Sequence, residues 1–140
     1  MVKVLSLLTC VVSLSAFMAG CGGSNKASGD NNKNVKKIAV VRNLAAGDHT
    51  QQFLDGCVSE GNKFGYQVDT FVTDGVDAKC QEVVAQVISK NYDGIIVSHG
   101  QLSYSYDMLQ PAVKKGMKVV TFDTMPFKGG DPNGQLLEGC

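Results

Sequence analysis

The sequence KIAVV at positions 37–41 decides the fold of this chain. Its apolar residues, Ile38 to Val41, form a short unbroken run of the kind found in strands that are buried on both faces of a sheet. Such strands occur mainly in parallel sheets, whose faces are covered by helices. We therefore expect a helix-covered parallel sheet to begin at this point.

Downstream of this run, apolar strand-like segments alternate with amphipathic helical ones. The first helical segment carries Phe53, Leu54, Cys57 and Val58 at helical spacing, and the segment beginning near 78 carries a similar stripe of valine and isoleucine. Expected strands cover 38–41, 66–72, 92–98 and 117–123, and expected helices cover 50–64, 78–90 and 104–115.

The ends of the expected helices carry recognisable signals. Thr50 and Asp77 are side chains that can cap a helix amino terminus. Gly65 and Gly116 follow the first and third helices, where glycine commonly ends a helix. Pro111 lies inside the third helix and predicts either a kink or a late start there.

Strands and helices that alternate in this way predict an α/β fold, a doubly wound parallel sheet with right-handed crossovers. We expect the strand order 2-1-3-4, which places the first helix on one face and the other two on the opposite face. Cys57 and Cys80 would then lie on different sides of the sheet, so two separate thiols are expected rather than a disulfide.

The amino-terminal segment has the parts of an export signal. Lys3 precedes an apolar stretch over 4–17, and LSAFMAGC at 14–21 places small residues directly before Cys21. This resembles the lipobox of bacterial lipoproteins, which implies cleavage before Cys21 and acylation of its thiol. A plain secretory peptide and a transmembrane anchor are the alternatives, although the apolar run is short for a bilayer span of about 20 residues.

Three parts of the chain follow from this pattern. Residues 1–20 are the expected signal peptide, and residues 21–36 are the expected lipidated cysteine and a tether rich in Gly, Ser and Asn. About a hundred residues remain, enough for one small domain over 37–140.

The formal charges balance, because lysine and arginine together number 13 and aspartate and glutamate together also number 13. No basic cluster is interleaved with aromatics, so nucleic acid is not expected as a partner.

The order of motifs resembles a known family. IAVV is followed by a polar loop, FLDGCVSEGNKFGYQVD, AQVISKNYDGIIVSHG and PAVKKGMKVVTFDT, spanning Lys37 to about Phe127. It looks like the amino-terminal, Rossmann-like lobe of a type I periplasmic binding protein, the sugar-binding lipoprotein of an ABC importer. In that family the solute lies between two lobes. This chain stops at Cys140 before a hinge and second lobe, so we expect the lobe to be incomplete.

The resemblance implies that solute-binding side chains lie at the carboxyl ends of the strands, where ligands bind in open α/β sheets. Asp123 falls where family members commonly place a carboxylate that accepts hydrogen bonds from sugar hydroxyls. Many relatives have an aromatic pair after the first strand, where this chain has His49 and Thr50, and many have Arg where it has Thr124. The candidate ligand-binding residues are Arg42, Asn43, Asp48, His49, Ser98, His99, Gln101, Asp123 and Thr124.

Three functions stay open at this point. The first is a lipid-anchored solute-binding component that captures a sugar or similar polyhydroxylated molecule outside the cytoplasm and delivers it to a membrane permease. The second is a sensing lipoprotein that presents its bound state to a membrane receptor kinase. The third is an exported enzyme. It is disfavoured because Ser98 lacks a G-x-S-x-G elbow and because no G-x-G-x-x-G follows the first strand. No cofactor is expected, and the two histidines lack metal-ligand spacing.

Overall fold

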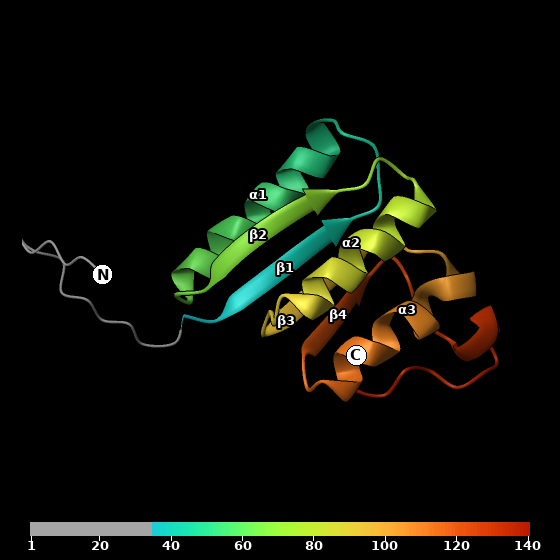
Figure 1. Cartoon of the computed structure of the whole chain (residues 1–140). Coiled ribbons are helices and arrows are strands. Elements are labelled where there is room, and N and C mark those ends of the chain that lie inside the picture. The colour runs from blue at the N-terminus through green and yellow to red at the C-terminus, as the bar shows by residue number, and fades with distance from the viewer. Residues whose placement is uncertain (1–34) are drawn as a thin grey trace, which may run out of the picture. The chain divides into compact units, whose positions relative to one another are not determined.

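The computed structural model describes residues 35–140. Within this range, four parallel strands form one sheet in the order β2-β1-β3-β4, as predicted (Figure 1). The strands are β1 (Lys37–Arg42), β2 (Gln67–Val72), β3 (Gly94–Ser98) and β4 (Lys118–Phe122). The expected signal peptide, the acylation at Cys21 and nearly all of the tether lie outside the described residues.

Helices cover the two faces of the sheet unequally. They are α1 (Asp48–Lys63), α2 (Asp77–Ser89) and α3 (Leu102–Lys114), and a short 3-10 turn, η1 (Lys128–Gly130), follows β4. Between α2, α3 and the sheet lies the main core, whose members include the fully buried Ala39, Val84 and Leu109. On the other face α1 covers β1 and β2, which leaves Val120 and Phe122 of β4 about half exposed.

The helices begin earlier than the sequence signals predicted. α1 begins at Asp48, two residues before Thr50, whose hydroxyl donates to the Ala45 carbonyl in the preceding loop. Asp77 is the first residue of α2 and makes no capping bond, because its carboxylate accepts from Asn43 and from another side chain described below. Both side chains thus serve tertiary contacts, and the prediction that they are N-caps is wrong.

The structure also tests the predicted start of the third helix and the two predicted glycine helix stops. α3 begins at Leu102 and contains Pro111, so the prediction of a late start is wrong. Gly65 and Gly116 follow α1 and α3 with φ of 75° and 79°, a left-handed conformation that glycine adopts without steric cost. Both predicted helix stops are therefore confirmed.

The cysteines of α1 and α2 form no disulfide. Cys57 on α1 and Cys80 on α2 are free, and they lie on opposite faces of the sheet, which was the predicted arrangement. Burial raises the pKa of the Cys80 thiol above its ordinary value.

Within residues 35–140, no helix combines the length and the apolar character that crossing a bilayer requires.

Candidate functional site

The carboxyl ends of β1, β3 and β4 lie at one edge of the sheet, here called the ligand edge. Strand register aligns Arg42 with Ser98, and Ser98 with Phe122. The chain positions that follow these residues, Asn43, His99 and Asp123, therefore come together although they are distant in the sequence. β1 and β3 are neighbours whose crossovers leave in opposite directions, and this is where open α/β sheets bind ligands.

Arg42 is the centre of this edge and has no exposed surface. Its guanidinium donates to the Ser98 hydroxyl at 2.6 Å and to His49 Nδ1 at 3.0 Å. The same group lies 4.4 Å from the centre of the Phe53 ring, a cation–π contact. Among the described residues, no carboxylate forms an ion pair with it, and its Nε is buried without a hydrogen-bond partner.

The Arg42 guanidinium fixes the proton position on the neighbouring His49 imidazole. Arginine only donates, so His49 must accept through Nδ1 and carry its proton on Nε2. Ser98 accepts from Arg42, and its oxygen lies 2.8 Å from His99 Nδ1. The buried guanidinium therefore orients His49 as an N–H donor at the ligand edge, and Ser98 links it to a second imidazole, that of His99.

His99 and Asp123 adopt a backbone conformation that is uncommon for residues with a side chain. Their φ angles are 61° and 62°, in the left-handed region. His99 Nδ1 and Asp123 Oδ2 lie 3.4 Å apart, and the two side chains are 32% and 44% exposed. A partly exposed carboxylate beside imidazole groups is suited to hydroxyl groups, which both donate and accept. Residues held in this conformation cluster at ligand sites.

An aromatic pair adjoins this polar group. Phe53 of α1 and Phe122 of β4 stack with ring centroids 5.4 Å apart and planes 23° from parallel. Phe122 is 49% exposed at the last position of β4, next to Asp123. The sequence resemblance suggested that an aromatic pair is absent after the first strand. The fold instead places one beside the ligand edge from two other elements.

Asn43 is held by bonds within the protein. It is 4% exposed, its amide nitrogen donates to Asp77 at 2.9 Å, and its amide oxygen accepts from the Thr73 hydroxyl at 2.7 Å. The Tyr104 hydroxyl donates to the same Asp77 oxygen at 2.9 Å. Burial, and then the Asp77 carboxylate, raise the pKa of Tyr104 well above its ordinary value. This network ties β1 to the starts of α2 and α3 and fixes the floor of the ligand edge.

The remaining candidates lie at the periphery. Asp48 is exposed in the first turn of α1, and Gln101 is exposed directly before α3. Thr124 is 8% exposed and donates to the Gly100 carbonyl at 2.7 Å. Gln101, Asp123 and Thr124 share a shallow hollow beside the end of β4, which they line with Gly100, Leu102, Thr121, Met125, Phe127 and Pro132.

The sequence reasoning missed five residues that shape this edge: Phe53, Thr73, Asp77, Tyr104 and Phe122. The sequence predicts a core position for Phe53, because this residue belongs to the apolar stripe of α1. Phe122 was detectable, since it directly precedes Asp123 at a strand end. In the described part of the chain, no cluster of three or more His, Cys, Asp or Glu side chains has the arrangement of a metal site.

Residues 38–134 match the family described as "Periplasmic binding protein domain", which is more than half of the chain. The chain belongs to the periplasmic binding protein family. Among curated proteins, no sequence matches it significantly.

Solved structures agree with this family in fold. A structure titled as a sugar ABC transporter from Yersinia enterocolitica is 48% identical with a TM-score of 0.64, and the match covers 66% of this chain and 28% of that one. A 5-methylthioribose transporter solute binding protein from Thermotoga lettingae, in complex with 5-methylthioribose, is 28% identical with a TM-score of 0.59 over 62% of this chain and 28% of that one.

A third structure supports the fold alone. It is an ABC transporter solute binding protein from Burkholderia graminis in complex with D-arabinose, 22% identical, with a TM-score of 0.55 over 65% of this chain and 32% of that one. The present chain therefore spans about a third or less of the length of these periplasmic binding proteins. The sheet described above corresponds to the predicted amino-terminal lobe.

Proposed function

We propose that this periplasmic binding protein is the solute-binding component of an ABC importer and captures a sugar or similar polyhydroxylated small molecule. The arrangement of Arg42, His49, Ser98, His99 and Asp123 at the ligand edge carries the proposal. It offers the His49 N–H donor, a second imidazole and one carboxylate. Sugar hydroxyls need both donors and acceptors, and charge-assisted bonds to a carboxylate orient them firmly.

The aromatic pair supports a sugar over a purely polar solute. Phe53 and Phe122 form an apolar surface beside the donors, and a sugar ring has an apolar face formed by its C–H groups. The names of the Yersinia and Thermotoga relatives, a sugar transporter and a 5-methylthioribose binding protein, point to the same class of solute. Asn43, Asp48, Gln101 and Thr124 remain further ligand residues of this proposal.

Capture without covalent chemistry is part of the proposal. Ser98 and His99 are in hydrogen-bonding contact and superficially resemble a nucleophile and its base. However, the Ser98 side chain is fully buried and accepts from the Arg42 guanidinium, so its oxygen is neither accessible nor activated. A nucleophile needs to reach the substrate and to gain electron density from its base.

We test solute binding by calorimetric titration of the protein, as expressed from its own gene, with pentoses, hexoses, 5-methylthioribose and, for comparison, amino acids. Saturable binding of at least one sugar is expected. Asp123→Asn is expected to weaken it by about tenfold or more, because the amide loses a charge-assisted bond. Asp131→Asn, which changes an exposed carboxylate after η1, serves as the matched control. Binding of an amino acid and of no sugar contradicts the proposed solute class.

We also propose that the protein acts outside the cytoplasm and is anchored through acylated Cys21. Support comes from the small residues before Cys21 and from the export expected of a periplasmic binding protein. Two acyl chains give stable anchoring where one chain does not. Labelling cells with an alkyne-bearing fatty acid should mark the wild-type protein and leave Cys21→Ala unmarked. Equal labelling of both proteins contradicts the anchor.

A further inference from the structure

Lysine side chains gather at the edge of the sheet opposite the ligand edge. In a parallel sheet the crossover helices run against the strands, so strand beginnings and helix ends share one edge. Seven of the ten basic residues within 35–140 lie at this edge, and we call the group the lysine edge. Its members are Lys36, Lys37, Lys63, Lys90, Lys114, Lys115 and Lys118.

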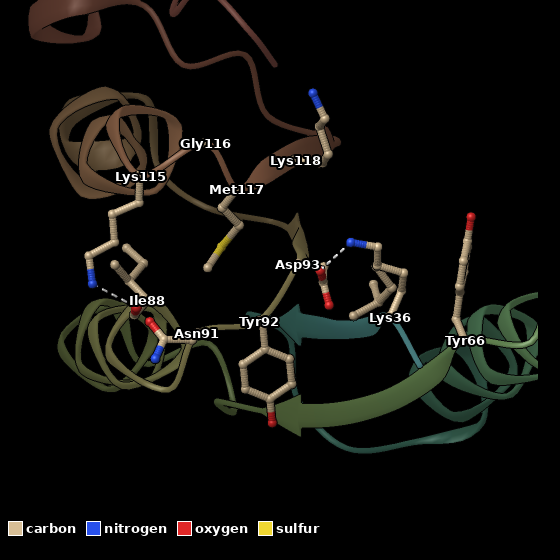
Figure 2. A pocket seen from close by; sticks show the side chains of 11 residues that line it. Lys36, Tyr66, Ile88, Asn91, Tyr92, Asp93, Lys115, Gly116, Met117 and Lys118 are labelled. Carbon is tan, nitrogen blue, oxygen red and sulfur yellow. Dashed lines mark hydrogen bonds and ion pairs between the residues drawn. The ribbon is translucent and has the colours of Figure 1, made fainter. Parts of the chain in front are cut away.

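The lysine edge surrounds a pocket at the start of the sheet. Figure 2 shows Lys36, Lys115 and Lys118 on its rim, with Asp93 and Tyr92 between them. Lys36 pairs with Asp93 at 2.8 Å, and Lys115 donates to the Ile88 carbonyl at the end of α2. Lys118 forms no ion pair with a described residue, and its amine points away from the other residues drawn (Figure 2).

Positive charge is in excess at this edge. Three carboxylates accompany the seven lysines: Asp93, Glu60 in a 2.6 Å pair with Lys63, and Glu138 in the segment that packs against the last turn of α3. A fourth, Asp69 in the middle of β2, is partly buried and accepts from the Tyr92 hydroxyl. By contrast, carboxylates gather at the ligand edge, where Asp48, Asp74, Asp77 and Asp123 lie.

Helix dipoles explain only some of these lysines. A cation near a helix carboxyl terminus is favourable, which accounts for Lys63, Lys90 and Lys114. Lys36, Lys37 and Lys118 lie just before or at the beginnings of strands, and none of them belongs to the last turn of a helix, where the dipole acts most strongly. A second reason is therefore needed for a continuous basic edge of this size.

The chain enters the domain at the lysine edge. Lys36 directly precedes β1, and Cys21 stands fifteen positions before Lys36 in the sequence. Fifteen residues reach at most about 50 Å when fully extended. If Cys21 is acylated, the tether joins the domain at the lysine edge, and its length allows this edge to reach the lipid headgroups.

We propose that the lysine edge docks on the anionic surface of the bilayer that holds the lipid anchor; this rests on the acylation of Cys21 proposed above. The docked domain turns its ligand edge away from the membrane, about 20 Å further out, which is the length of a six-residue strand. Each lysine near an anionic surface strengthens adsorption roughly fivefold, and salt weakens the attraction because it screens charges beyond about 8 Å.

Amine acylation of the lipidated protein in vesicles tests this orientation. The protein is reconstituted in neutral phosphatidylcholine vesicles and in vesicles containing 30% phosphatidylglycerol, a probe composition of about one anionic lipid in three. Mass spectrometry then gives the reaction rate of each lysine. Lys90 and Lys118 are expected to react several-fold more slowly on anionic vesicles than on neutral ones. Their reaction rates should return to the neutral-vesicle values in 1 M salt, because charges are then screened beyond about 3 Å.

Lys79 and Lys128 are the internal controls, because they lie away from the lysine edge on the same domain. Their rates should be the same on both vesicle types. Equal rates for all four lysines on both vesicle types, or equal slowing of all four on anionic vesicles, overturn the proposal. Sedimentation with neutral vesicles reports the anchor separately, since a protein without acyl chains stays in the supernatant there whatever its lysines do.

A matched pair of variants adds a second measurement. Lys90→Gln/Lys118→Gln should reduce the slowing at the remaining lysines of the edge, whereas Lys79→Gln/Lys128→Gln should leave it unchanged. All four side chains are exposed, so neither double variant disturbs the core. If Lys79→Gln/Lys128→Gln removes the slowing and Lys90→Gln/Lys118→Gln does not, the lysine edge is not the surface that docks.

Discussion

Replacing Arg42 by methionine should weaken solute binding strongly while changing stability only modestly. Arg42 is fully buried and without a carboxylate partner among the described residues. Desolvating its charge costs several kcal/mol. Two charge-assisted hydrogen bonds offset this by about 1.5–3 kcal/mol each, and the contact with Phe53 by up to about 2 kcal/mol. The guanidinium is therefore close to neutral in net stability.

Methionine at this position contributes about 1.5–3 kcal/mol of apolar burial and leaves no buried charge. We expect the free energy of unfolding of Arg42→Met to lie within about 2 kcal/mol of the wild type. Solute binding should weaken by at least about tenfold, because His49 and Ser98 lose the donor that orients them.

Arg42→Lys provides the informative comparison. Lysine keeps a buried charge, is more strongly hydrated in the unfolded chain and forms fewer hydrogen bonds, so it should cost about 3 kcal/mol. Burial lowers the pKa of such a lysine in the folded state. The unfolded chain then binds more protons, and the stability of Arg42→Lys should rise with pH below the ordinary lysine pKa.

Urea denaturation of the three proteins, followed by circular dichroism, measures these differences, and calorimetry measures solute binding. The expected order of stability is wild type and Met close together, with Lys below both. A loss above about 4 kcal/mol in Arg42→Met would refute the reasoning, since Arg42 would then be a structural residue that the fold requires. Unchanged solute binding in Arg42→Met would refute its role in the site.

Three further predictions follow from the packing. Asn43→Ala should lower the free energy of unfolding by about 2–4 kcal/mol in urea denaturation, because it leaves buried polar partners unsatisfied. Gly61→Ala places a methyl group against a β2 side chain and should lower the free energy of unfolding by about 1–3 kcal/mol. Gly56→Ala meets open space on the same helix and should raise the free energy of unfolding by up to about 1 kcal/mol. Equal effects of the two alanines in thermal denaturation would contradict this. Burial, and then the Asp69 carboxylate, raise the pKa of Tyr92 to about 12. The folded protein thus holds a proton that the unfolded chain releases near pH 10, so stability should fall from pH 10 to 12, and Tyr92→Phe should remove this part of the decline in alkaline denaturation.

The fold was largely predictable from the chain because its signals are local. Apolar runs such as 38–41 and 94–97, amphipathic stripes between them, and glycines at 65 and 116 specify strands, helices and stops within a few residues. The alternation then leaves few topologies, since parallel crossovers are almost always right-handed. Helix starts were less predictable, because Thr50 and Asp77 form tertiary bonds in place of caps.

The candidate site was predictable in part. Strand-end positions follow from the fold, so the pattern of strands in the sequence sufficed to name Arg42, Ser98, His99 and Asp123 as neighbours. Their individual functions could not be predicted in this way. Whether Asn43 faces solvent or the interior depends on Thr73 and Asp77, around the connection from β2 to α2, and on Tyr104 of α3, both distant in the sequence.

The fold class, the order of the elements and the edge at which polar side chains meet are encoded locally in the sequence, because each depends on short-range patterns of polarity and backbone preference. Three-dimensional packing is what buries Arg42 without a counter-charge, stacks Phe53 and Phe122 beside it, and brings seven lysines to the opposite edge. The physical reason is that burial, stacking and the summed charge of a surface are properties of groups brought together through space, and sequence separation does not encode those distances.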